Sequence, residues 1–79
     1  MSQFRVTATL EGKSAMHPDY PLLPGDIIAA EVDWDDDGNE IDTGTWMKHA
    51  PGIGIGGFVL TDDDVATLEP ADDVRWVIA

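Results

Sequence analysis

Acidic side chains are concentrated in the stretch 31–42 (EVDWDDDGNEID), which contains seven Asp or Glu residues and no basic one. Four of its residues form the pattern D-x-D-x-D-G, which begins an EF-hand calcium loop: Asp33, Asp35, Asp37 and Gly38. The second half of such a loop is missing, because Glu40 stands where the loop has an apolar residue and Gly44 where it has a bidentate Glu. We therefore expect a solvated acidic hairpin with at best millimolar affinity for calcium, and we predict no cofactor and no metal site.

No other motif in the chain is typical of catalysis or of phosphate binding. His17 and His49 are isolated histidines in segments that contain proline, and no nucleophile motif accompanies them. The glycine run at 51–57 (PGIGIGG) lacks the Lys-Ser/Thr of a phosphate-binding loop and the spacing of a dinucleotide fingerprint. The run indicates a curved strand, or an edge that pairs with another chain. We predict that the protein is not an enzyme.

Alternation of apolar and polar residues predicts five short strands, at 4–10, 26–35, 40–48, 53–60 and 74–78. An Asp-Gly sequence between the second and third of them favours a hairpin. Three prolines in 14–25 predict a long loop, held down by four apolar side chains: Met16, Tyr20, Leu22 and Leu23. Thr61, followed by Asp64 three residues later, is typical of the N-terminal cap of a short helix.

The position of the turn decides which residues of the hairpin lie opposite each other. A two-residue turn at the Asp-Gly sequence would place Trp34 beside Ile41, with both side chains in the core. Directly opposed carboxylates would follow on the outward face, in the pairs Asp35 with Glu40 and Asp33 with Asp42. A β-bulge at Gly44 is expected to shift the phase of the strand, which makes Trp46 a candidate for an exposed contact.

An outward face made of carboxylates is the strongest indication of function in the chain. Opposed like charges destabilise a hairpin. We therefore expect such a face either to bind a basic partner or a cation, or to discourage edge-to-edge aggregation. The predicted partner-binding residues are Glu31, Asp33, Asp35, Asp37, Glu40, Asp42 and Trp46.

The whole chain is acidic, with 16 Asp and Glu residues against 4 Lys and Arg and a net charge of -12. This charge argues against direct contact with nucleic acid or an anionic membrane, whose phosphates it would repel, and it favours a basic partner. Adaptation to salt gives a similar composition. The sequence indicates one domain over 1–79, no disulfide, no signal peptide and no membrane span. We expect a cytoplasmic protein, or a virion component assembled in the cytoplasm.

Five short strands, turn-rich links and one helical turn resemble the layout of small SH3-like β-barrels, with an OB-like barrel as the alternative. The composition is similar to that of small acidic accessory proteins encoded by phages. The layout implies a mostly β, five-stranded antiparallel barrel with one short helix. We predict an acidic module that docks on a basic protein surface, as an inhibitor or as a nucleic-acid mimic that occupies a nucleic-acid-binding protein. The alternative is a structural particle component, such as a virion decoration or connector subunit, that self-associates through the glycine-rich strand.

Overall fold

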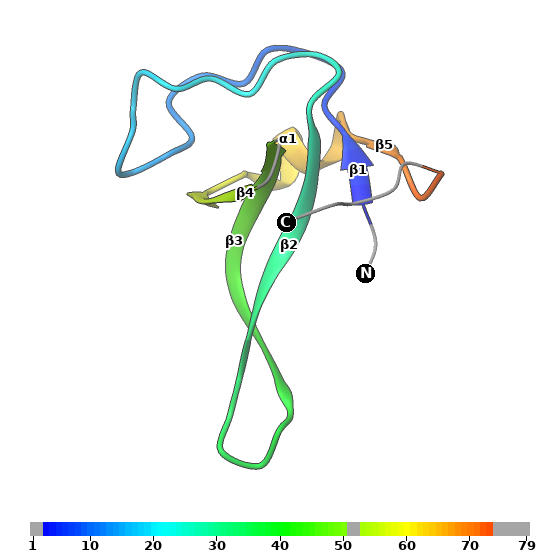
Figure 1. Ribbon diagram of the computed structural model, residues 1–79. Helices are drawn as coiled ribbons and strands as arrows, with labels where there is room; N and C mark the ends of the chain where they lie inside the picture. Colours follow the sequence, from blue (N-terminus) through cyan, green and yellow to red (C-terminus); the bar gives the residue numbers. More distant parts are fainter. Residues whose placement is uncertain (1–2, 51–52, 74–79) are drawn as a thin grey trace.

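The computed structural model describes residues 3–50 and 53–73, and it confirms a mostly β protein with one short helix (Figure 1). The elements are β1 (Gln3–Arg5), β2 (Ile27–Trp34), β3 (Glu40–Ala50), β4 (Ile53–Phe58), α1 (Asp62–Ala66) and β5 (Glu69–Pro70). The strand predicted at 74–78, which includes Trp76, lies outside the described residues. No described helix is long and apolar enough to cross a membrane.

The strands form one antiparallel sheet in the order β4-β3-β2-β1-β5. Among the described strands β4 and β5 lie at opposite edges, so the sheet is open and the predicted closure into a barrel is not found. The strand predicted at 53–60 is found as β4, which lies at an edge. At the other edge β5 contains Pro70, which has no backbone N–H to donate to a further strand.

The core is small and lies where the loop between β1 and β2 folds over the sheet. Its buried members are Val6, Leu10, Leu22, Ile28 and Phe58. The predicted strand 4–10 is interrupted after β1 ends at Arg5. Val6 still donates to Asp26 O and accepts from Gly25 N, and the next β-bridge joins Leu10 to Leu22. The predicted loop at 14–25 is confirmed. However, Met16 and Leu23 do not hold it down, because they are 85% and 49% exposed.

The predicted pairing of 26–35 with 40–48 is confirmed as the β2–β3 hairpin, but its register differs from the prediction by one residue. The turn holds three residues rather than two, since Gly38 N donates to Asp35 O and Asp35 N donates to Asn39 O. Gly38 has a φ of 82°, the left-handed conformation that ends this three-residue turn. As a result Trp34 pairs with Glu40 instead of Ile41.

The far half of this hairpin projects from the molecule as a two-stranded ribbon, which we call the arm and define as residues 32–42 (Figure 1). β1 pairs with β2 only as far as Ala29, and the pairing of β4 with β3 begins at Trp46. No third strand therefore covers the arm among the described residues. Three apolar side chains expected in the core are exposed as a consequence: Val32 (40%), Trp34 (59%) and Ile41 (46%).

The predicted helix start is confirmed at α1, where Thr61 and Asp64 form a reciprocal capping box. Asp64 N donates to Thr61 Oγ1 at 3.1 Å, and Thr61 N donates to the Asp64 carboxylate at 3.0 Å. Lys13 Nζ lies 2.7 Å from the same carboxylate and ties the long loop to the helix. Lys13 first, and then Thr61, hold the pKa of Asp64 below its usual value.

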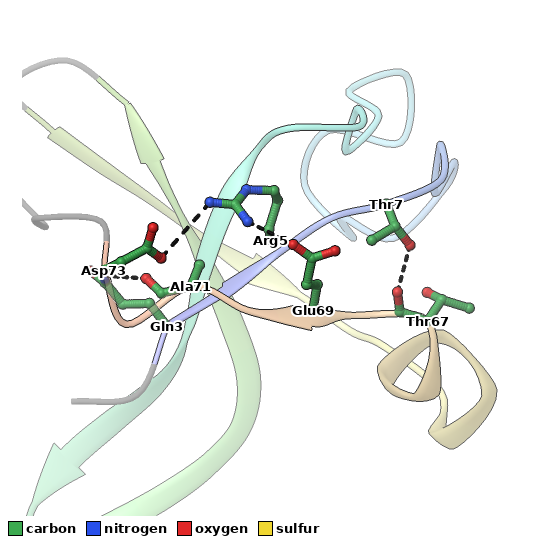
Figure 2. Close-up of polar contacts among 7 residues, drawn as sticks. All are labelled: Gln3, Arg5, Thr7, Thr67, Glu69, Ala71 and Asp73. Atoms are coloured by element: carbon green, nitrogen blue, oxygen red, sulfur yellow. Dashed lines mark hydrogen bonds and ion pairs between the residues drawn. The ribbon is translucent and has the colours of Figure 1, made fainter.

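The segment after the helix is fixed to β1 by polar contacts that Figure 2 shows. Arg5 lies 2.7 Å from the Glu69 carboxylate and 4.0 Å from that of Asp73. Gln3 Nε2 donates to Ala71 O at 3.2 Å, and the hydroxyl of Thr7 donates to Thr67 O. These contacts hold β5, which is only two residues long, at its edge of the sheet.

Candidate functional site

The arm is the most acidic exposed feature of the molecule, and its strands set apolar side chains opposite carboxylates. The register pairs Trp34 with Glu40, Asp33 with Ile41, and Val32 with Asp42. Opposed residues project from the same face of a ribbon. The predicted face made of carboxylates alone, with Asp35 opposite Glu40 and Asp33 opposite Asp42, is therefore wrong. The extra turn residue shifts one strand by one position, and a shift by one exchanges the faces.

Glu31 is half-buried, and its carboxylate accepts hydrogen bonds from other residues of the sheet. Its Oε1 accepts a hydrogen bond from Gly57 N at 2.6 Å and one from Thr45 Oγ1 at 3.1 Å. Gly56 leaves room for it, since a Cβ at that position would lie 2.7 Å from both carboxylate oxygens. Glu31 thus ties β2 to β4 across β3. The structure thus gives the Glu31 carboxylate contacts within the sheet, and its predicted partner-binding role stays a prediction.

The predicted bulge at Gly44 is confirmed and marks the base of the arm. The register shifts between Ala30 and Val32, and Gly44 has a φ of 74°. Asp42 Oδ1 accepts a hydrogen bond from Gly44 N at 2.8 Å, and Thr43 Oγ1 donates to Glu31 O at 3.1 Å. One oxygen of the Asp42 carboxylate is therefore engaged in holding the bulge.

Two further carboxylates of the predicted site also accept hydrogen bonds from the backbone beside them. Asp35 Oδ1 accepts from Asp37 N at 2.9 Å and from Asn39 N at 2.8 Å, which fixes the turn. Asp33 Oδ1 accepts from Trp34 N at 2.8 Å. Asp residues favour turns for this reason, because their short side chains reach nearby N–H groups.

Three arm carboxylates have no hydrogen-bond or ion-pair partner among the described residues: Asp36, Asp37 and Glu40. All three side chains are exposed. The sequence predicted Asp37 and Glu40 as site residues but not Asp36, which is equally exposed and unpaired. Trp34 was not predicted as a site residue either, because the alternation of its strand indicated a core position. Exposed Trp34 and the three unpaired carboxylates all lie on the arm.

The basic side chains of the described residues do not neutralise the arm, because each is paired elsewhere. Arg5 contacts Glu69, Lys13 contacts Asp64, and Lys48 Nζ lies 3.4 Å from the Asp26 carboxylate. Lys48 also donates to the Tyr20 hydroxyl at 2.9 Å. Burial acts to lower the pKa of Lys48, but Tyr20 and Asp26 outweigh it and the pKa is raised. Among the described residues, no Lys or Arg side chain therefore neutralises the arm carboxylates.

Trp46, the remaining member of the predicted site, lies on the other side of the bulge. It is half-buried and pairs with Ala30 and Phe58. Its ring meets Phe4 edge to face, with centroids 5.8 Å apart and an interplanar angle of 74°. Trp46 therefore packs against the edge of the core, and the structure does not bring it together with the arm carboxylates.

The two histidines noted in the sequence belong to no metal-binding group in the described part of the chain. His17 is exposed in the long loop, whereas His49 is half-buried and lies in β3 opposite Gly54. Within the described ranges no group of three or more His, Asp or Glu side chains is placed to hold a metal ion. A shallow hollow of about 280 Å³ lies on the long loop and is lined by Glu11, Gly12, Pro18, Asp19 and Pro21.

Comparisons with protein-family models, with curated proteins and with solved structures found no match for this chain.

Proposed function

We propose that this protein is a binding module whose arm docks on a basic protein surface. The observation that supports this most is the combination of exposed Trp34 with unpaired carboxylates on one projecting ribbon. An isolated two-stranded hairpin is at best marginally stable in water, so apolar side chains on it gain from a covering surface. Full burial of one such side chain contributes about 1.5–3 kcal/mol.

The charge of the arm indicates which kind of partner surface it would bind. The arm carries only acidic charges, and the cations of the described residues are paired within the body. A basic partner would be attracted at a distance and would associate faster at low ionic strength. Aromatic residues are also enriched in the centres of protein interfaces. The arm contains no Ser, Thr, Cys, His or Lys side chain, and we propose binding and not catalysis as its role.

An inhibitor or nucleic-acid mimic is the specific form of this role that we favour. A narrow ribbon that presents Asp36, Asp37 and Glu40 can enter a groove whose basic side chains normally contact phosphates. We propose that the protein acts in the cytoplasm, or in a virion if it is a phage protein. The SH3-like layout stays a prediction for this open sheet, and the proposed role does not depend on it.

A pull-down with two charge-matched variants tests the proposal. One variant neutralises the arm (Asp36→Asn, Asp37→Asn, Glu40→Gln), and the other neutralises three exposed carboxylates of the body (Glu11→Gln, Asp19→Asn, Asp63→Asn). We expect the wild type and the body variant to retain a basic protein from host lysate at low salt and to release it at high salt. The arm variant should retain little. Equal retention by the two variants would contradict docking through the arm.

A second candidate is a structural particle component that self-associates through β4. The observation that favours it is the position of β4 at the edge of the sheet. On the side of β4 that faces away from β3, Phe58 is the only described β4 residue that forms a β-bridge, and its partner is Ser14. Edge strands can add a strand from another chain. Sedimentation of the purified protein at micromolar concentration separates the two candidates. Concentration-dependent oligomers would favour self-association, and a monomer would argue against it.

A further inference from the structure

We propose that Trp34 and Glu40 form a recognition site for an arginine side chain of the partner protein. This inference rests on the proposed docking of the arm and specifies which chemical group the arm takes. Trp34 and Glu40 are cross-strand partners near the tip of the arm, and both are exposed. An indole ring beside an unpaired carboxylate suits a planar cation, because the face of the cation can stack on the ring while its N–H groups donate to the carboxylate.

The geometry follows from the register. Directly opposed residues have Cβ atoms about 4.5–5.5 Å apart and project from the same face of the ribbon. Trp34 is 59% exposed, the most exposed of the three apolar side chains of the arm. A guanidinium stacked on its ring would therefore have the Glu40 carboxylate within reach of its N–H groups.

Glu40 is the carboxylate of the arm strands that is available for such a contact. Asp33, Asp35 and Asp42 each accept a hydrogen bond from a neighbouring backbone N–H. No described residue donates to Glu40, and no described cation lies beside it. Asp36 and Asp37 are also unpaired, but they lie in the turn and have no aromatic partner across the ribbon. Among the described arm residues, only at this pair does an exposed aromatic ring therefore lie opposite a carboxylate that has no partner.

Arginine fits the pair better than lysine does. A guanidinium is planar, is weakly hydrated, stacks on aromatic rings and donates two parallel hydrogen bonds to one carboxylate. An ammonium is a compact and strongly hydrated point charge that cannot stack while it donates in this way. Val32, two residues from Trp34 on the same face, offers an apolar surface for the methylene groups of the arginine. The site should therefore discriminate between two cations of equal charge.

Hexaarginine and hexalysine peptides test this discrimination on the full chain. Each peptide is titrated by calorimetry at two salt concentrations, and the indole N–H signal of Trp34 is followed by NMR. We expect hexaarginine to bind about 5–10-fold more tightly than hexalysine, a difference within the range of one desolvated cation–π contact. Only hexaarginine should shift the Trp34 signal strongly.

Three variants locate the effect. Trp34→Leu keeps an apolar side chain without the ring, and Glu40→Gln removes the carboxylate; each should bring the affinity for hexaarginine close to that for hexalysine. Asp63→Asn removes one charge from α1, outside the arm, and should preserve the preference. The NMR spectrum of each variant verifies that the fold is intact.

The possible outcomes separate this inference from the proposed function. Equal, salt-sensitive binding of the two peptides would overturn the arginine site and leave docking on a basic surface intact. Binding of neither peptide at low salt would contradict both. A preference for hexaarginine that Trp34→Leu does not reduce would also overturn the site, because the preference would then arise elsewhere on the surface.

Discussion

The Glu31 carboxylate accepts a hydrogen bond from Gly57 N at 2.6 Å, although β3 lies between their two strands. The bulge at Gly44 displaces β3 locally, and the missing side chain at Gly56 leaves space for the carboxylate. An acidic residue that the sequence places on a binding surface thereby becomes a connection between three strands. The hydrogen bond lies in the body of the sheet, where β2, β3 and β4 are neighbours, and the arm projects beyond it.

Replacing Glu31 should weaken the fold, whereas replacing Glu40 should not. Glu31→Ala removes an ionised acceptor and leaves Gly57 N–H without it, so we expect a loss of about 1.5–3 kcal/mol in the free energy of unfolding. Glu40→Ala removes an exposed carboxylate from the same hairpin and should change the free energy by no more than about 0.5 kcal/mol. Urea unfolding of both variants measures the difference. Equal effects would contradict the structural role of Glu31.

Gly56→Ala should be destabilising because its new Cβ would displace the Glu31 carboxylate. A Cβ there lies 2.7 Å from the carboxylate oxygens, which can move only by giving up their contacts with Gly57 and Thr45. We expect a loss of about 1–2 kcal/mol in the wild type and much less in the Glu31→Ala background. A double-mutant cycle by urea unfolding measures this coupling. Purely additive effects would show that Gly56 is required for another reason.

Asp35→Ala should loosen the tip of the arm with little effect on global stability. The Asp35 carboxylate accepts from Asp37 N and Asn39 N, and its loss leaves both amides to solvent. We expect amide hydrogen exchange at these two positions to become about 5–10-fold faster, as expected for the loss of about 1 kcal/mol of local hydrogen bonding. Asp36→Ala is the matched control, because this side chain has no such contact. Unchanged exchange in Asp35→Ala would contradict this role.

Trp34→Ala should cost little stability, unlike replacement of the fully buried Phe58. Trp34 is 59% exposed and Phe58 is fully buried. We expect a change of about 0.5 kcal/mol for Trp34→Ala and about 3–5 kcal/mol for Phe58→Ala. Thermal or urea unfolding provides the comparison. A loss of several kcal/mol for Trp34→Ala would mean that the arm folds back onto the body in solution.

Lowering the pH should remove the stabilisation that Asp64 provides. The pKa of Asp64 is lowered in the folded state, so its contribution is fully present above the unfolded pKa of about 4 and is lost as the pH falls through the lower folded pKa. Asp64→Asn should therefore reduce the stability difference between neutral pH and strongly acidic pH. Thermal unfolding at several pH values below 5 measures it. An unchanged pH profile in the variant would contradict the role of the Lys13 contact.

Local sequence signals determined several elements without help from the tertiary structure. Thr61 with Asp64 specified the helix cap, Gly44 specified the bulge, and the Asp-Gly sequence specified a hairpin between β2 and β3. Each of these features depends on residues only a few positions apart along the chain or on backbone conformations that one residue type favours. The acidity of the arm was likewise apparent from composition alone.

Only the tertiary structure decided which of these residues are covered and which are exposed. Alternation cannot tell a strand buried by neighbours from one that extends past them, so Trp34 and Ile41 fitted a core that the body does not provide. One extra turn residue placed Ile41 on the face opposite to that of Trp34, because the side-chain period of a strand is two. Glu31 reached a glycine backbone far along the chain, and no local pattern encodes such a contact. Pairing between distant segments therefore determined which part of the hairpin stays uncovered, whereas hydrogen bonds from nearby backbone N–H groups engaged Asp33, Asp35 and Asp42.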